Sequence, residues 1–297
     1  MPISYPPERI ASLLPSATEI VRALGLEASL VAVSHSCDFP GRIESLPRVT
    51  RTRVPKAAPS GEIDAVVRDC LTQGESLYEI DVEALDRLQP DLVITQALCE
   101  VCAVGPGELS RVIPALQSVP EVLTLEPHTL EGAFQSIVEV GRATGRVEEA
   151  ESLVASLRCR VAAIRVRTAR RSVRPRVGFL EWIDPPMCGG HWNPELVELA
   201  GGRDGLGRAG QPSRTLRWEE ILEFQPEVLV LACCGYTAER TGRDVALLRQ
   251  HPGFADLPCS RTGRIYVLDG VTRFSRPGPG LVDSLEALAA VLGAGAD

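Results

Sequence analysis

The chain has 297 residues, of which 44% are hydrophobic and 24% are charged, and this composition supports a packed core. A net charge of -8 argues against a nucleic-acid partner, because binding an extended phosphate backbone requires a strongly basic face. The sequence shows neither a secretory leader pattern nor an apolar run of about eighteen residues, so we expect a protein that is not membrane-embedded and is cytoplasmic, or periplasmic or otherwise extracytoplasmic if the true start lies upstream.

Short apolar runs with the length of buried strands recur along the chain. In the first half they occupy residues 9–14, 29–34, 91–95 and 121–125, and in the second half residues 176–180, 227–232 and 264–268. Helical patterns lie between them, and strands that alternate with helices are typical of parallel sheets. The sequence therefore predicts an α/β fold with two lobes, residues 1–131 and 173–297.

The segment between the lobes, residues 132–172, contains no proline and many strong helix formers. After a break near Gly145, residues 147–170 are predicted to form one helix of about 35 Å, long enough to join two lobes. Its arginines, from Arg158 to Arg171, are interpreted as a solvated helix face, with contact to an acidic partner as the alternative.

Two segments, one in each half of the chain, resemble each other. "LQPDLVIT" at residues 88–95 and "FQPEVLVL" at residues 224–231 each combine a helix end, a proline and a strand. Earlier in the chain, Ser16 and Glu19 have the spacing of a capping box at the first strand-to-helix turn. Such a turn presents backbone N–H groups at the carboxyl end of the sheet, where α/β folds bind ligands.

Six segments, spread over nearly the whole chain, resemble the sequence of a known family. They are "RIASLLPSATEIVRALGLEASLVAVSHSCDFP", "LDRLQPDLVIT", the central helix, "DPPMCGGHWNPELVELAGG", "LRWEEILEFQPEVLVL" and "TRFSRPGPGLVDSLEAL". In this order they resemble the class III substrate-binding proteins of ABC transporters, in the branch that binds cobalamin and iron-siderophores. The resemblance implies two Rossmann-like lobes joined by a single long helix, a ligand cleft between the lobes, and presentation of the ligand to a permease.

The ligand loops depart in part from the family pattern. Where cobalamin binders carry aromatic side chains against the corrin, this chain has Ser36 and Gln96, and a third such position falls near Ser213. Phe274 and Arg276 match the C-terminal ligand loop of the family. The predicted ligand-binding residues are Ser16, Ser36, Gln96, Trp182, Trp192, Tyr236, Phe274 and Arg276.

Cysteines occupy the loops that would face the cleft. The predicted metal-ligating residues are Cys37, Cys99, Cys102, Cys188, His191, Cys233 and Cys234. Thiolates are the ligands that zinc, copper(I) and iron-sulfur clusters prefer, and two cysteines two residues apart form a common half-site. Cys233 and Cys234 cannot both point the same way in extended backbone, so one of them is expected in the core. Cys70, Cys159 and Cys259 are interpreted as small hydrophobic residues.

The sequence leaves several roles open for these cysteines. Cys99 and Cys102 can bind a metal, act as a dithiol redox pair or pack in a core. A cysteine can also meet cobalt or heme iron as an axial ligand, which would reconcile the sulfur with a tetrapyrrole.

The sequence thus supports two hypotheses for function. The first is a non-enzymatic protein that binds a corrinoid or another metal-containing ligand between its lobes. Its expected partners are this small-molecule or metal ligand and an ABC permease. The second is an intracellular cysteine-ligated metal or iron-sulfur protein with a redox role. Neither a nucleotide-binding glycine loop nor a legible Ser/His/Asp arrangement supports other enzyme classes.

Overall fold

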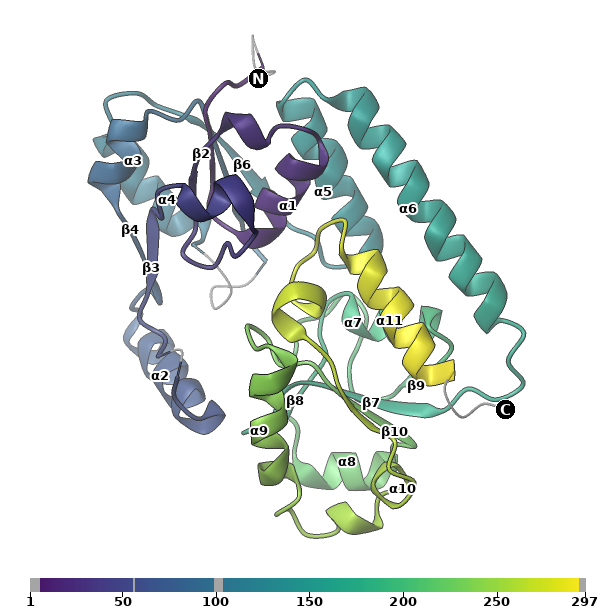
Figure 1. Ribbon diagram of the computed structural model, residues 1–297. Coiled ribbons are helices and arrows are strands. Elements are labelled where there is room, and N and C mark those ends of the chain that lie inside the picture. Colours follow the sequence, from purple (N-terminus) through teal and green to yellow (C-terminus); the bar gives the residue numbers. More distant parts are fainter. Residues whose placement is uncertain (1–5, 56, 99–103, 294–297) are drawn as a thin grey trace. The chain divides into compact units, whose positions relative to one another are not determined.

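The computed structural model describes residues 6–55, 57–98 and 104–293, and the chain divides into two compact units (Figure 1). Unit 1 comprises Met1–Ala58, Ala65–Pro127 and Gly132–Ala155, and unit 2 comprises Pro59–Asp64, His128–Glu131 and Ser156–Asp297. Two short segments that lie within the first half of the sequence therefore belong to unit 2. Beyond this division, the predicted boundaries at residues 131 and 173 stay a prediction.

Unit 1 is built on a parallel sheet of four strands in the order β2-β1-β5-β6. The strands are β1 (Ile10–Ser12), β2 (Leu30–Val33), β5 (Leu92–Gln96) and β6 (Glu121–Leu125). Each lies within or beside a predicted apolar run. All three residues of β1 are buried, because the strand is central and both faces of the sheet are covered.

The other elements of unit 1 include helices and a short ladder. The helices are α1 (Pro15–Ala23), α2 (Ser60–Gln73), which begins in the 59–64 segment, α3 (Val82–Leu88), α4 (Pro106–Val112) and α5 (Leu130–Ala143), which begins in the 128–131 segment. The strands β3 (Thr50–Thr52) and β4 (Tyr78–Ile80) pair antiparallel on either side of α2 in the sequence. A core of Ala11, Ala32, Leu85, Val93 and Leu109 joins the sheet to α3 and α4.

Unit 2 has a sheet in which β7 (Arg176–Trp182), β10 (Val228–Leu231) and β11 (Ile265–Val267) run parallel. On the other edge of β7, β9 (Arg203–Asp204) pairs parallel near its start and β8 (Met187–Cys188) pairs antiparallel near its end. The helices are α7 (Asn193–Leu199), α8 (Trp218–Phe224), α9 (Ala238–Leu248), α10 (Pro258–Arg261) and α11 (Leu281–Gly293).

The two units share one strand order. The order β2-β1-β5-β6 in unit 1 corresponds to β9-β7-β10-β11 in unit 2. The similarity predicted between residues 88–95 and 224–231 is confirmed at the level of the backbone. In both, a helix ends on a glutamine with positive φ, Gln89 at 41° and Gln225 at 52°, and a proline and a strand follow.

The predicted long helix is confirmed as α6 (Val147–Thr168), which has 22 residues and a length of about 33 Å. It ends two residues before the predicted boundary. Its sequence explains its length, since it lacks proline and has glutamates in the first turn and arginines in the last, where they complement the helix dipole. Within the part of the chain that the structure describes, no helix has the length and apolar character of a membrane span.

Candidate functional site

The predicted ligand residues of unit 2 gather in the loops that follow its strands. Trp182 ends β7, Tyr236 follows β10, and Phe274 lies in a π-helical turn, Gly270–Phe274, after β11. These loops leave the carboxyl ends of neighbouring parallel strands, which is the edge of an α/β sheet where ligands bind. The strand order therefore brings these residues together.

Trp182 and Tyr236 form an aromatic pair at this edge. Their ring centroids lie 5.0 Å apart with an interplanar angle of 47°. Trp182 is partly exposed, and its Nε1 donates a hydrogen bond to the carbonyl of Asp184 at 3.0 Å, which fixes the indole. Tyr236 is buried, with 6% of its surface exposed. The pair therefore consists of a partly exposed indole that packs against a buried phenol ring.

Arg240 supports Tyr236 from α9. Its guanidinium carbon lies 4.5 Å from the centre of the Tyr236 ring, and its Nη2 donates to the Tyr236 hydroxyl at 3.4 Å. Asp244 accepts from Nη1 of Arg240 at 2.8 Å. Burial raises the pKa of Tyr236 to about 12, so the hydroxyl stays protonated. Sequence reasoning missed Arg240, although the spacing of four residues from Arg240 to Asp244, which suits an ion pair within a helix, was a readable signal.

Phe274 and Trp192 fill the interior of unit 2. Phe274 is 1% exposed and packs edge-on against Phe179 at 5.2 Å. Trp192 is 5% exposed and donates from Nε1 to the carbonyl of Phe274 at 2.9 Å. Arg276, two residues further on, is also buried. These residues hold the loop after β11 in place, so their predicted role in ligand contact stays a prediction.

Glu181 and His191 lie beside this interior. Glu181 accepts hydrogen bonds from the Gly190 backbone N–H at 2.9 Å and from Asn193 Nδ2 at 3.3 Å, and burial raises its pKa. The carboxyl group thus ties β7 to the loop before α7. His191 has a positive φ of 52°, and its ring lies 5.5 Å from that of His128. Burial, together with the nearby His128, lowers the pKa of His191.

In unit 1 the predicted residues differ in exposure. Ser36 is exposed, whereas Ser16 and Gln96 are buried. Cys37 is buried, and its Sγ lies 3.1 Å from the Thr18 hydroxyl and 3.4 Å from the Ser34 hydroxyl. This thiol therefore belongs to a polar cluster beneath α1.

The capping box predicted at Ser16 is wrong. The helix begins at Pro15, so Leu14 is the N-cap residue and makes no side-chain cap hydrogen bond. Proline suits the first helical position because its missing N–H would have no partner there. Ser16 is consequently inside the first turn and not before it.

The predicted cysteine-bound metal centre finds no support in the residues that the structure describes. Cys37, Cys188 and Cys233 are buried, and burial raises the pKa of Cys188 and raises that of Cys233 to about 12. Among the described positions, no group of three or more His, Cys, Asp or Glu side chains is arranged to hold a metal ion. Cys99 and Cys102 lie outside the described residues. Where they are described, the buried thiols serve the packing of each unit.

The question left open between Cys233 and Cys234 has an answer. Cys233 is fully buried, whereas Cys234 is exposed. Cys234 lies in a turn that follows β10, and the hydrogen bond from the Tyr236 N–H to the Cys233 carbonyl at 3.0 Å closes this turn. Cys234 thus remains on the surface, in the turn after β10.

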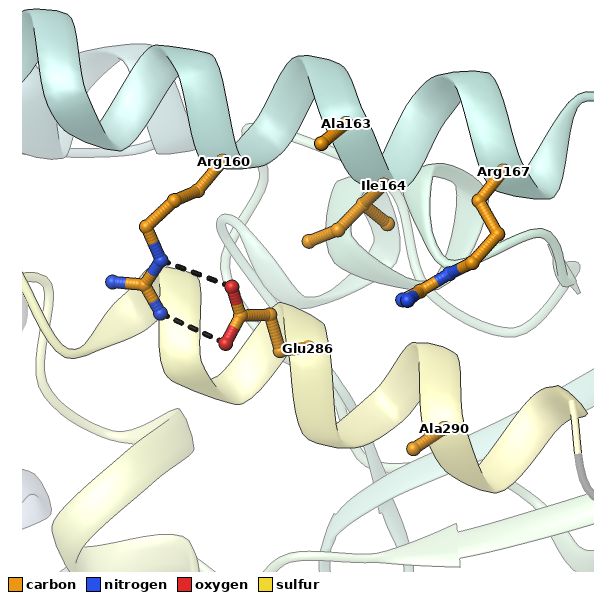
Figure 2. Close-up of a pocket in the computed structure, with 6 residues that line it drawn as sticks. All are labelled: Arg160, Ala163, Ile164, Arg167, Glu286 and Ala290. Carbon is orange, nitrogen blue, oxygen red and sulfur yellow. Dashed lines mark hydrogen bonds and ion pairs between the residues drawn. The ribbon is translucent and has the colours of Figure 1, made fainter.

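Two cavities lie away from the predicted residues. One of about 320 Å³ lies between α6 and α11 in unit 2 (Figure 2). It is lined by Arg160, Ala163, Ile164, Arg167, Glu286 and Ala290. The other, of about 280 Å³, lies in unit 1 beside α4 and β6. Neither is lined by a residue that the sequence predicted for ligand binding.

Comparison with known proteins gives one consistent result. The sequence model of the periplasmic binding protein family matches residues 10–272. The vitamin B12-binding protein of Vibrio cholerae serotype O1 is 25% identical over 286 residues, which covers 95% of this chain and 88% of that protein.

Solved structures agree over nearly the full length. The periplasmic heme-binding protein RhuT from Roseiflexus sp. RS-1 is 26% identical, with a TM-score of 0.72 and coverage of 98% of this chain and 99% of that one. The periplasmic vitamin B12-binding protein BtuF of Vibrio cholerae is 24% identical, with a TM-score of 0.69 and coverage of 97% of both chains.

Proposed function

The chain belongs to the periplasmic binding protein family, the substrate-binding proteins of ABC transporters, and we propose that it holds a corrinoid against the Trp182–Tyr236 pair. The family consists of non-enzymatic proteins that bind a small molecule and work with a permease. The permease partner that the sequence predicted therefore agrees with the family.

The aromatic pair is the observation that carries the proposal. A corrin presents a broad and largely apolar face, and an indole fixed at an angle to a second ring offers a matching surface at the edge where α/β sheets bind ligands. Arg240 and Asp244 keep Tyr236 in place, so little ordering is required when a ligand arrives. The 25% identity to a vitamin B12-binding protein over 95% of the chain supports this ligand class.

Heme is the second candidate. A heme-binding protein is 26% identical to this chain over 98% of its length. Heme and corrinoids share a planar metal-containing macrocycle, so the same aromatic surface suits both. They differ at the rim, where heme carries carboxylates and corrinoids carry amides.

The comparisons argue against two features of the sequence hypotheses. The two solved relatives above are periplasmic proteins, which favours an extracytoplasmic location over the cytoplasmic one that we expected. The relatives named above bind vitamin B12 or heme, so the iron-sulfur protein with a redox role is not supported. We propose an extracytoplasmic protein that delivers its ligand to a permease.

Calorimetric titration with aquocobalamin, diaquocobinamide and hemin tests the proposal. Trp182→Ala should weaken binding of the preferred ligand about tenfold, since loss of one stacking ring costs about 1.4 kcal/mol. Trp218→Ala is the matched control. Trp218 packs on His251 beyond the end of α9, whereas Tyr236 precedes its start, and the 11 residues of α9 span about 16 Å.

The two variants separate the outcomes. Weaker binding in Trp182→Ala with wild-type binding in Trp218→Ala supports the site. Equal affinities in all three proteins would reject the aromatic pair as the ligand surface, and absence of binding by the wild type to all three ligands would reject the function.

A further inference from the structure

The helices α6 and α11 border a cavity of about 320 Å³ that the proposed function does not use (Figure 2). All of its lining residues belong to unit 2. Ala163, Ile164 and Ala290 form its apolar wall, and Ile164 is 3% exposed. A water molecule takes up about 30 Å³ of the liquid, so the cavity has room for about ten non-hydrogen atoms of a small organic molecule.

One end of the cavity is electrostatically satisfied. Arg160 binds Glu286 through hydrogen bonds of 2.9 and 2.8 Å and also pairs with Asp283. Figure 2 shows the Glu286 carboxylate turned toward Arg160. Arg160, and to a smaller extent the charge of Arg167, lowers the pKa of Glu286. Two carboxylates thus face one guanidinium at this end, which leaves no excess of positive charge there.

The other end of the cavity carries positive charge. Figure 2 shows the Arg167 side chain extending from α6 into the space between the helices, and within the described parts of the chain no ion pair engages its guanidinium. Shortly after the end of α6, Arg171 donates to the carbonyls of Ala200 and Ala289, at 2.9 Å each. Burial and the nearby charge of Arg167 lower the pKa of Arg171. Two guanidinium groups therefore lie near each other at the end of the cavity beside Ala290.

We propose that this cavity binds a small organic monocarboxylate, with the carboxylate at Arg167 and the apolar body against Ile164 and the two alanines. A guanidinium binds carboxylates in a planar, often bidentate geometry, and an anion beside Arg167 and Arg171 relieves their repulsion. Asp283 and Glu286 at the far end disfavour a second negative charge on the ligand. The site is separate from the Trp182–Tyr236 pair, so the inference does not depend on the proposed function.

Benzoate and benzamide test the requirement for charge, because they share a shape and differ in the carboxylate. In ligand-observed NMR titrations, the wild type should bind benzoate at least about tenfold more tightly than benzamide. In Arg167→Gln the affinity for benzoate should fall to that for benzamide, which should itself stay unchanged. Arg165→Gln is the matched control, because Arg165 is exposed on the same helix but does not line the cavity, and it should keep the wild-type preference.

Filling the cavity tests its apolar part. Ala163→Leu places a larger side chain in the space that the ligand would occupy, so it should weaken benzoate binding at least about tenfold. Ala162→Leu adds the same side chain at the neighbouring exposed position of α6, which does not line the cavity. This control should bind benzoate with the wild-type affinity.

Three results would overturn the proposal. Equal weakening in Arg167→Gln and Arg165→Gln would indicate a general attraction of anions to the arginines of α6. Wild-type benzoate binding in Ala163→Leu would place the ligand outside the cavity. Absence of benzoate binding by the wild type up to about 10 mM would reject the site itself. Circular dichroism and the unfolding midpoint of each variant verify that a loss of binding does not reflect misfolding.

Discussion

Tyr236 shows how a few side chains can prepare a surface. The ring is held by Arg240 on α9, and Arg240 is held by Asp244 one turn later. The backbone of the same turn leaves Cys233 inside and Cys234 outside. One short segment after β10 thus supplies packing, an aromatic ring and an exposed thiol.

The buried Cys233 gives a prediction about alkaline stability. Its pKa is raised from 9.0 to about 12 by burial. Between these values the unfolded chain releases the thiol proton and the folded chain retains it, so the free energy of unfolding falls as pH rises, by at most about 1.4 kcal/mol per pH unit. Below pH 9 the thiol is protonated in both the folded and the unfolded chain, so this loss of stability is absent. Denaturant titrations at pH 7.5, 9 and 10.5 measure the free energy of unfolding across the range.

Cys233→Ala should show a shallower decline over this range than the wild type. Cys159→Ala, which removes an exposed thiol, should retain the wild-type slope. An unchanged slope in Cys233→Ala would contradict the assignment of alkaline sensitivity to this thiol.

Single residues were the hardest to predict from sequence. Cysteines that pack and cysteines that bind metal occupy the same kinds of loop, and only the neighbours decide between them. Cys37 is surrounded by the hydroxyls of Thr18 and Ser34, which no spacing in the sequence indicates. The capping box predicted at Ser16 was wrong for a similar reason, because Pro15 occupies the first helical position.

Among the elements, the left-handed glutamines at the ends of α3 and α8 give a second prediction. A residue with a side chain pays about 1 kcal/mol in this backbone region, and glycine avoids that cost. Gln89→Gly and Gln225→Gly should each raise the free energy of unfolding by about 0.5–1 kcal/mol, measured by chemical denaturation.

Arg87→Gly provides the contrast within α3. A glycine inside the helix should lower the free energy of unfolding by about 1 kcal/mol. If the change at Gln89 destabilises the protein as much as the change at Arg87, the positive φ at position 89 is not a source of strain.

The packing of α6 on α11 gives a third prediction. Arg160 binds Glu286 through two hydrogen bonds of 2.9 and 2.8 Å and also pairs with Asp283, whereas Arg167 occupies the other end of the same cavity (Figure 2). Because these groups are partly exposed, Arg160→Ala should lower the free energy of unfolding by about 1 kcal/mol. Arg167→Ala should cost less than about 0.5 kcal/mol. Thermal denaturation of both variants compares these losses of stability. Equal losses would contradict a stabilising role of the Arg160 ion pairs.

The elements themselves were largely predictable. Each apolar run contained or bordered a strand, and β10 is apolar throughout because both of its faces are covered. The helix α6 was readable from its length without proline. The strands β3, β4, β8 and β9 were missed. They have two or three residues each, too few for any periodicity to be recognised.

For the whole molecule, the repeated strand order and the family match make a ligand the central expectation. A ligand that binds the folded chain alone stabilises it by about 2.7 kcal/mol when its concentration is 100 times the dissociation constant. Diaquocobinamide or aquocobalamin should therefore raise the unfolding midpoint of the wild type. The increase should be smaller in Trp182→Ala at the same ligand concentration. An identical increase in both proteins would place the ligand elsewhere.

The most direct test of the account is equilibrium dialysis of the purified wild-type chain against diaquocobinamide, aquocobalamin and hemin, with the bound metal quantified. The account predicts retention of about one tetrapyrrole per chain, with a corrinoid retained in preference to hemin. No retention of any of the three would contradict it.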